Sequence, residues 1–296
     1  MTDCIVAGEA NVDILVQAAA GLEAGKEKWA QDMNLVLGGS SAITAFNLAK
    51  MGTTVAFCGV IGRDLFGTFV TDFLAKANID LSGVVRSSRE KTGVTLWIRA
   101  RGERAGLTYA GSIASLRADD ITDERLKTAR HLHVGAYFLQ TRFHSGAVSL
   151  FKRAKKLGLT TSLDCNYDPA ERWDSNISTV LQYTDIFLPN EQEARLLTGL
   201  SDVRSAAREL MKAARVVVVK RGARGVLAFD ASSTLTLPAI KTRVVDTTGA
   251  GDSFNAGFLH AFLRKKSIRD CANAGMKAAA KSVTAVGGTA AFEDRR

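Results

Sequence analysis

The chain has 296 residues, 46% hydrophobic and 23% charged, a composition that is ordinary for a folded enzyme and excludes a disordered or fibrous chain. Its formal net charge of +9 is compatible with a polyanionic partner, but the 39 lysines and arginines are scattered and accompany no nucleic-acid-reading motif. We therefore expect no nucleic-acid partner, and an anionic small substrate fits the charge equally well.

Neither a targeting segment nor a membrane span is expected. The first residues, MTDCIVAGEANVD, carry an acid at the third position and too short an apolar run for a signal peptide. The longest uncharged stretch, residues 33–49, contains glycine, serine, threonine and asparagine, which is unlike a membrane span. We expect a cytoplasmic protein with no membrane partner.

Short β-branched runs alternate with helix-period segments along most of the chain, the pattern of a parallel sheet covered by helices. The expected strands are residues 4–8, 54–62, 131–135, 159–164, 185–189 and 216–220. The expected helices are residues 41–52, 65–78, 144–156, 190–198, 202–213, 250–263 and 268–283. These elements predict an α/β fold with a doubly wound, mostly parallel sheet, in a single domain over residues 1–296.

Two strand pairs interrupt this alternation, because no helix separates residues 12–17 from 33–38 or residues 92–100 from 106–111. We predict that they form one small β-sheet, contributed by about residues 12–38 and 92–111, which covers the main sheet's strand ends as a lid. The alternative is an extension of the main sheet's edge. Exposed lid edges favour pairing with a second copy, so we expect a homodimer through the lid.

The cysteines are far apart in sequence and form no C-x-x-C pair, so buried free thiols are expected rather than disulfides or zinc. His131 and His133 alternate along one strand face. No third histidine or cysteine lies nearby, so a structural role is favoured over a metal pair.

The segment DTTGAGDSF, residues 246–254, places two glycines directly before an Asp and the start of a helix. Glycine permits a tight turn and the close approach of a ligand, and amides in the first turn of a helix attract anions. An Asp there would compete with the anion, unless it accepts a proton from an attacking hydroxyl. A plain helix N-cap is the alternative interpretation.

This segment closely resembles the C-terminal signature of the ribokinase-like (PfkB) family of carbohydrate and nucleoside kinases. Further segments resemble the family's motifs in the family's order, namely residues 8–13, 38–52, 63–80, 188–199, 216–229 and 271–288. The resemblance implies that Asp252 is the catalytic base. It also implies that the amides of Gly249, Ala250, Gly251 and Asp252 form an anion hole for the phosphoryl group.

The motif PNEQE carries Asn190 and Glu193, three residues apart at the start of a helix. They share one face at the carboxyl end of a strand, where open α/β sheets bind ligands. Glu193 can hold Mg²⁺ through water while Asn190 reaches a phosphate group. The spacing is also that of a capping box, and the two interpretations are compatible.

The segment KRGARG follows a buried strand, from whose end Lys220 would point toward phosphates. Gly222 and Gly225 permit a tight turn there, and a plain hairpin turn is the alternative. The resemblance of residues 216–229 and 271–288 to the family implies that both segments enclose the nucleotide, with Gly251 and Asn273 among its contacts.

Short polar side chains and glycines near the N-terminus suit the phosphoryl acceptor, because they can hydrogen-bond vicinal hydroxyls and let backbone approach a ligand. By resemblance, the acceptor-binding residues are Asn11, Asp13, Gly38, Gly39 and Asp252. Ile43 departs from the family pattern, which usually has a sugar-contacting Asn there. We expect Ile43 to line and narrow the acceptor pocket, which places the usual pentose or hexose in doubt.

The sequence thus predicts an ATP-dependent, Mg²⁺-requiring kinase that phosphorylates a primary hydroxyl of a sugar or sugar-like small molecule. The resemblance implies a monovalent cation such as K⁺ at Asp246 and Thr248, with backbone carbonyls near residues 286–288. A nucleoside kinase and a non-catalytic binding protein on the same fold stay open. A base clamp for a nucleoside could come from Trp29, Trp97, Tyr137 or Phe138. A Rossmann dehydrogenase is disfavoured, because no G-x-G-x-x-G follows the first strand.

Overall fold

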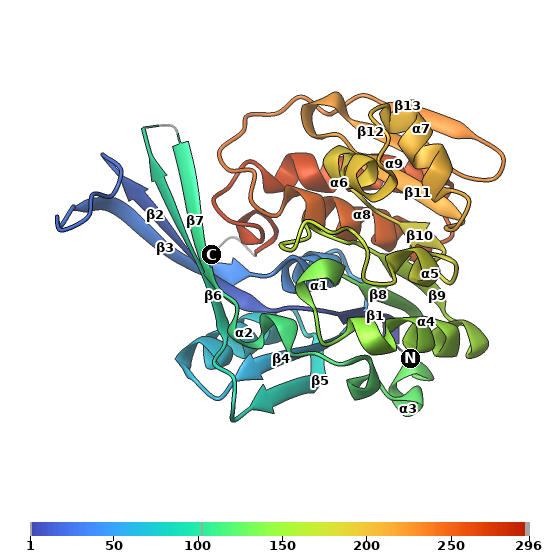
Figure 1. Cartoon of the computed structure of the whole chain (residues 1–296), viewed down its shortest axis with the longest axis horizontal. Coiled ribbons are helices and arrows are strands. Elements are labelled where there is room, and N and C mark those ends of the chain that lie inside the picture. The colour runs from blue at the N-terminus through green and yellow to red at the C-terminus, as the bar shows by residue number, and fades with distance from the viewer. Residues whose placement is uncertain (1, 102, 294–296) are drawn as a thin grey trace.

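The computed structural model describes residues 2–101 and 103–293; Gly102 of the predicted lid, and residues 1 and 294–296 of the predicted domain, lie outside the described residues. One large sheet has helices on both sides, and a long, narrow second sheet projects from this body (Figure 1).

The large sheet has the strand order β13-β12-β11-β10-β9-β8-β1-β4-β5. Neighbours pair in parallel except β11 with β12 and β12 with β13. The prediction of a mostly parallel sheet is therefore confirmed. The strands are β1 (Thr2–Ala7), β4 (Val55–Gly62), β5 (Asp80–Ser87), β8 (Ala129–Val134), β9 (Thr160–Leu163), β10 (Ile186–Phe187), β11 (Val216–Lys220), β12 (Val226–Phe229) and β13 (Thr234–Leu237).

Two hydrophobic cores, one on each face of the sheet, hold the helices in place. In β1 the side chains alternate, with Cys4 and Val6 in one core and Ile5 and Ala7 in the other, as expected of a strand buried on both faces. On the Cys4 side pack α1 (Ser40–Lys50), α2 (Leu65–Ala75), α8 (Ala250–Leu263) and α9 (Ile268–Ser282). On the other side pack α3 (Asp123–Leu126), α4 (His144–Lys156), α5 (Ile177–Leu181), α6 (Glu191–Thr198) and α7 (Val203–Leu210).

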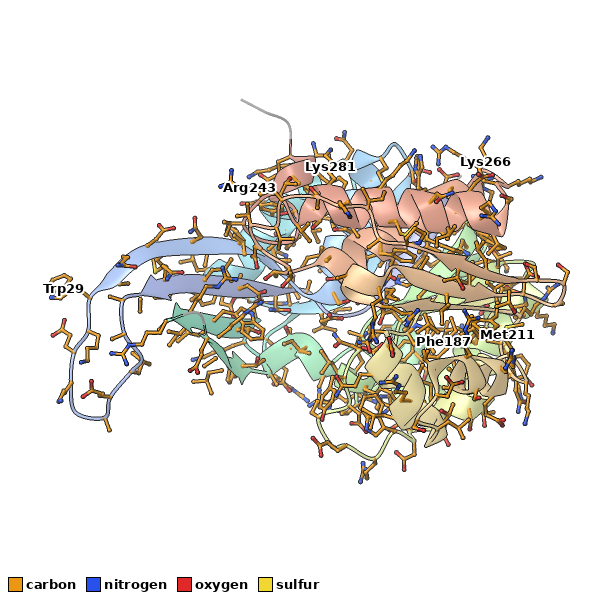
Figure 2. The ribbon with its side chains drawn as sticks, turned by 90° about the horizontal axis from the view of Figure 1, so that it is seen from above. Trp29, Phe187, Met211, Arg243, Lys266 and Lys281 are labelled. Carbon is orange, nitrogen blue, oxygen red and sulfur yellow. The ribbon has the colours of Figure 1, made fainter. Side chains whose placement is uncertain are left out.

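The predicted lid forms as a separate sheet with the order β3-β2-β6-β7, so it is not an extension of the main sheet's edge. Its strands are β2 (Asn11–Ala18), β3 (Ala30–Gly38), β6 (Gly93–Ala100) and β7 (Glu103–Tyr109). β2 pairs in parallel with β6 and antiparallel with β3. The chain therefore leaves β1, runs outward along β2 and returns along β3 to the start of α1. Figure 2 shows Trp29 near the far end of this sheet.

The lid has two unlike faces. The face that carries Asn11 and Asp13 turns toward the loop at Asp246, which an arginine of β6 contacts. The opposite face is apolar, and beyond its root it leaves Met33 and Leu107 exposed to 65% and 73%.

All four cysteines are buried free thiols, as expected. His131 and His133 are buried and hydrogen-bond hydroxyl groups of Thr160 and Ser162, which supports the structural interpretation. Burial lowers the pKa of His131 to about 3 and that of His133 to about 4. Within the described residues no helix combines the length and the apolar character that crossing a membrane requires.

Candidate active site

Asp252 lies in the first turn of α8, directly after the glycine loop. Gly249 is the N-cap residue, and its φ of 71° is in the left-handed region that glycine adopts without strain. Within the described residues, the N–H groups of Gly249, Gly251 and Asp252 find no acceptor, whereas Ala250 donates to the carbonyl of Thr247. The loop thus presents free amides beside a carboxylate, at the positive end of a helix dipole.

The Asp252 carboxyl group titrates near neutral pH. Burial is the main cause that raises its pKa to about 7; the hydrogen bond from Ser40 lowers the pKa, and the carboxylates of Asp164 and Glu9 raise it. A carboxylate poised at this pH can accept a proton from an alcohol and release it again.

Two helix N-termini meet at Asp252. Ser40, in the first turn of α1, donates a short hydrogen bond to the Asp252 carboxylate, and the Thr44 hydroxyl donates to its carbonyl. Asn47, farther along α1, donates to Ser253 Oγ and to the carbonyl of Gly288, both at 2.9 Å. α1 therefore fixes the orientation of Asp252, a role that the sequence did not reveal for Ser40.

Lys220 lies at the end of β11, beside the free amides. Its Nζ is 2.7 Å from Asp164 Oδ2 and 3.2 Å from Asn255 Oδ1, and a Cβ on Gly251 would lie 3.7 Å from Nζ. Burial lowers the pKa of Lys220, but Asp164 and Glu193 outweigh this and raise it, so the amine stays charged. Asn255 also donates to Asp164.

Asn190 and Glu193 form the capping box that their spacing predicts. The Asn190 side chain accepts from the amide of Glu193, and Glu193 accepts from the Asn190 backbone N–H at 2.7 Å and from its Nδ2 at 2.5 Å. Burial, with the nearby charge of Asp164, raises the pKa of Glu193 to about 7. Ligand atoms of Asp164, Cys165 and Glu193 lie within 4.8 Å of one another.

A cavity of about 530 Å³ opens between the start of α6 and the β11–β12 turn. Its lining brings together three of the predicted nucleotide residues, Asn190, Lys220 and Gly222. Gly225 closes the turn with a φ of 81°, where a Cβ would collide with the carbonyl of Leu237. The turn is thus the hairpin connection considered from the sequence, and it also borders the cavity.

Three guanidinium groups at this cavity share one buried carboxylate, that of Glu191, and leave a surplus of positive charge at its mouth. Arg195 and Arg224 approach Glu191 to 2.6 Å and Arg221 to 3.1 Å. Sequence reasoning did not single out Glu191 or Arg195. Asn273 lies half-buried on α9, where its side chain hydrogen-bonds none of the described residues.

The predicted acceptor residues gather at the root of the lid. Asn11 Nδ2 donates to Asp13 Oδ1 at 3.0 Å, and a Cβ on Gly38 would collide with the Asp13 carboxylate. A Cβ on Gly39 would lie 2.9 Å from Asn11 Oδ1, so both glycines give these side chains room. Because Gly39 directly precedes Ser40, this group adjoins Asp252.

Ile43 is buried, 3% exposed, beneath the glycine loop. A Cβ on Gly288 would lie 2.7 Å from Ile43 Cδ1, and one on Gly249 would lie 3.2 Å from Ile43 Cγ2. The side chain therefore packs against the backbone of the glycine loop and of Gly288.

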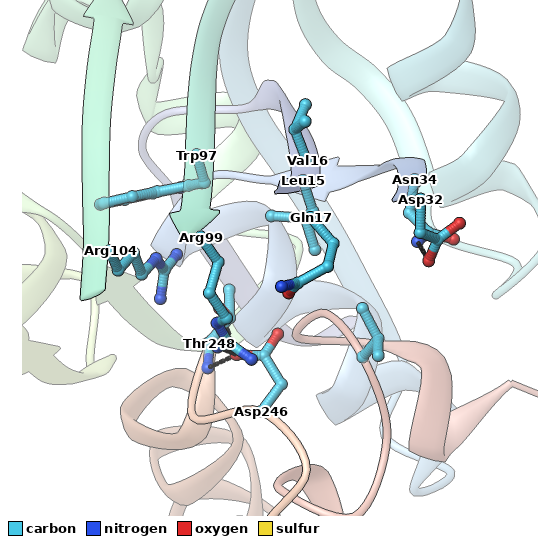
Figure 3. Close-up of a pocket in the computed structure, with 11 residues that line it drawn as sticks. Leu15, Val16, Gln17, Asp32, Asn34, Trp97, Arg99, Arg104, Asp246 and Thr248 are labelled. Atoms are coloured by element: carbon cyan, nitrogen blue, oxygen red, sulfur yellow. Dashed lines mark hydrogen bonds and ion pairs between the residues drawn. The ribbon is translucent and has the colours of Figure 1, made fainter. Parts of the chain in front are cut away.

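Asp246 is held by donors on several sides. Its Oδ1 accepts from the amide and the hydroxyl of Thr248, and its Oδ2 accepts from the amide of Gly287 at 3.0 Å. Arg99 of β6 reaches Oδ1 at 3.4 Å, as Figure 3 shows. The lid thus contacts the loop that leads to Asp252, an interaction that the sequence did not predict.

Known proteins that are similar to this chain in sequence and known proteins that are similar in fold both include ribokinases. The pfkB family carbohydrate kinase model matches residues 1–295. A ribokinase of Haemophilus influenzae is 28% identical over 98% of this chain and 95% of its own length. An Arabidopsis thaliana ribokinase solved with ribose and ATP has a TM-score of 0.85, is 26% identical and covers 99% of this chain and 96% of its own.

An Escherichia coli structure in complex with ATP and Mg²⁺ has a TM-score of 0.89 at 22% identity, covering 99% of this chain and 96% of its own; at that identity it shows the shared fold. The match of the family model spans nearly the whole chain, and it agrees with the order of the motifs and with the arrangement of the two sheets. The chain belongs to the pfkB family of carbohydrate kinases.

Proposed function

We propose that this protein transfers the γ-phosphoryl group of ATP to a primary hydroxyl of a sugar or sugar-like small molecule, with Asp252 as general base. The observation that carries the proposal is a carboxylate with a pKa of about 7 that lies among free amides at the start of α8, between an acceptor-like and a nucleotide-like set of residues. Asp252 would take the acceptor's hydroxyl proton as that oxygen attacks.

Charge that develops on the transferred group needs fixed positive partners. The free N–H groups of Gly249, Gly251 and Asp252, together with the ammonium of Lys220, can supply them. Ala250 belongs to the predicted anion hole by position, but its amide is engaged by Thr247, so the other three carry the proposal. Lid closure over the acceptor would exclude water and suppress hydrolysis of ATP.

The nucleotide would bind in the cavity lined by Asn190, Lys220 and Gly222. Gly225 closes the turn that borders this cavity, and we propose Asn273 of α9 as a further nucleotide contact. Mg²⁺ fits the donor set there, because Asp164 and Glu193 offer two carboxylates within 4.8 Å and Mg²⁺ needs only one or two, completed by water. Both oxygens of Glu193 already accept from Asn190, which favours contact through water. The ion would neutralise charge on the β- and γ-phosphates.

A monovalent cation fits Asp246 and Thr248 less well than Mg²⁺ fits Asp164 and Glu193. K⁺ requires oxygen lone pairs, whereas the Asp246 carboxylate faces N–H and O–H donors and the guanidinium of Arg99. We therefore assign K⁺ no part in the reaction.

The acceptor would lie between Asp252 and the lid root, hydrogen-bonded by Asn11 and Asp13 and approached by the backbone of Gly38 and Gly39. A sugar suits this site better than a nucleoside, because Tyr137 and Phe138 are buried in the core and Trp29 lies at the lid's far end. Only Trp97 of the candidate aromatic residues lines a cavity at the lid. We propose a cytoplasmic reaction, which the use of ATP and the free thiols support.

The test is ADP release from ATP and Mg²⁺ with a panel of sugars, sugar acids and nucleosides, comparing the wild type with Asp252→Asn. We expect the variant to lose about 10²–10⁴ in kcat, the typical contribution of a general base, while ATP binding stays nearly unchanged. Wild-type turnover by Asp252→Asn at saturating acceptor would show that Asp252 is only a helix cap.

A further inference from the structure

A small cavity lies between the inner face of the lid and the loop that carries Asp246 (Figure 3). Its volume of about 150 Å³ is below the roughly 300 Å³ at which small-molecule pockets begin, so it can hold one end of a ligand. Its polar lining includes Gln17, Arg99 and Arg104, and the ring of Trp97 forms part of its wall.

This cavity continues the acceptor site outward along the lid. Asn11, Asp13, Leu15 and Gln17 lie on one face of β2, because side chains alternate along a strand. The first two form the acceptor group at the lid root, and the last two line the cavity. Trp97 pairs with Leu15 across the sheet and lies near the Asp13 carboxylate, whose ionised form it favours. A ligand whose hydroxyl lies at Asp252 would therefore extend its other end into this cavity.

Two arginines face each other at this cavity. Arg99 and Arg104 are direct partners across the antiparallel β6–β7 pair, and like charges in that position destabilise a sheet. Arg99 is paired with Asp246. Arg104 stacks 3.7 Å over the Trp97 ring, and in residues 2–101 and 103–293 no carboxylate lies within 4 Å of its guanidinium nitrogens.

Asp246 and Asp13 favour the charged form of Arg104 from a longer distance. The Asp246 carboxylate is engaged by Arg99, Thr248 and Gly287. Asp13 lies at the lid root and accepts a hydrogen bond from Asn11. Asp32, at the far side, accepts from Asn34. Stacking on Trp97 thus holds the Arg104 guanidinium in a fixed orientation. Its N–H groups are available to donate hydrogen bonds to an anionic ligand.

We propose that Arg104, with Arg99 beside it, binds an anionic group at the end of the acceptor remote from the phosphorylated hydroxyl, so that the acceptor is a sugar acid or another anionic sugar derivative. The inference rests on the proposed function, because the acceptor's orientation is set by Asp252. A carboxylate or a phosphate suits a guanidinium equally, through paired N–H···O bonds.

The test compares acceptors that share a free primary hydroxyl at C6 and differ at C1: glucose, gluconate and glucose 1-phosphate. We expect the wild type to show at least a tenfold higher kcat/KM for one of the two anions than for glucose. Arg104→Met keeps an unbranched side chain over Trp97 but removes the charge. It should lower that kcat/KM about 10- to 100-fold, as expected for a hydrogen bond to a charged group, and change glucose less than about twofold. Lys26→Met removes an exposed lid charge outside the cavity and should change neither.

Several outcomes separate this inference from the proposed function. Phosphorylation of glucose at least as well as of both anions, or an equal loss for all three in Arg104→Met, overturns the anion site and leaves the kinase proposal standing. If no acceptor releases ADP, the kinase proposal fails for these compounds and ligand-induced thermal shift decides the inference. A rise in melting temperature with either anion that Arg104→Met abolishes supports the site, and no rise in the wild type overturns it.

Discussion

Asp252 is the general base of the proposed reaction, and its surroundings lead to a pH prediction. A general base must be ionised, and burial has moved the pKa of this carboxyl group up to about 7. We expect kcat/KM to fall about tenfold per pH unit below pH 7 and to level off above it. A profile measured from pH 5 to 9 checks this, with the melting temperature followed in parallel to exclude unfolding. A level profile down to pH 5 would contradict the assignment.

Ile43 is a second residue whose role can be tested. Its contacts with the backbone at Gly249 and Gly288 lead us to expect that Ile43→Asn buries an unpaired amide, which costs about 1–3 kcal/mol, and lowers the melting temperature by several degrees. The ratio of kcat/KM values among different sugars should stay the same. Ile43→Val, which removes one methylene, serves as the control. A selective gain with ribose in Ile43→Asn would instead support the pocket role expected from the sequence.

Among the site residues, the sequence predicts those that belong to a recognisable local motif. Glycines before an Asp at a helix start indicate Asp252, and the capping-box spacing indicates Asn190 and Glu193. Asn255 was not predicted, because it is a single polar residue between Phe254 and Ala256. A signal was available, since Asn255 follows Asp252 by three residues on the same helix face.

Among the elements, the lid contacts the body through Arg99 and Asp246, and this contact predicts how the reaction rate depends on K⁺. Arg99 already places a positive charge against Asp246, so we expect the rate to change less than about twofold when K⁺ is replaced by choline at equal ionic strength. Arg99→Met removes that charge and should make the rate depend on K⁺. The measurement is a K⁺ titration of both proteins. Strong K⁺ activation of the wild type would show that a cation displaces Arg99.

The sequence predicts a strand when the strand is long and apolar enough to stand out from its neighbours. β1 and β4 lie inside the sheet, and their continuous apolar runs mark them as strands. β5 is missed because it is an edge strand with a polar, half-exposed sequence. β12 and β13 have only four residues each, and each follows a turn, so each resembles a loop in isolation. The order of strands depends on contacts far apart in sequence, which local patterns do not report.

Among the described residues, four large apolar side chains are exposed on the outer face of the lid. Met33 and Leu35 on β3 and Leu107 and Tyr109 on β7 are exposed there, and exposed apolar patches commonly mark interfaces. We predict a homodimer through this face. Light scattering at micromolar concentration should give twice the chain mass of 31.7 kDa.

Leu107→Glu should convert the dimer to a monomer, because a charge would be buried without a partner. Leu65→Glu, at an equally exposed position on α2, serves as the control and should leave the mass unchanged. A monomeric wild type, or a dimer that survives Leu107→Glu, would contradict this interface.

The place of β1 between β4 and β8 has a consequence for synthesis on the ribosome. β1 can pair with β4 once residues 55–62 have emerged, but its other edge needs residues 129–134, more than a hundred residues after β1. During that interval the nascent chain carries an uncovered, apolar strand edge, the kind of surface that pairs with other chains. We infer that slowing translation before residue 134 would promote aggregation, whereas slowing it later, after β8 has closed that edge, would have a smaller effect.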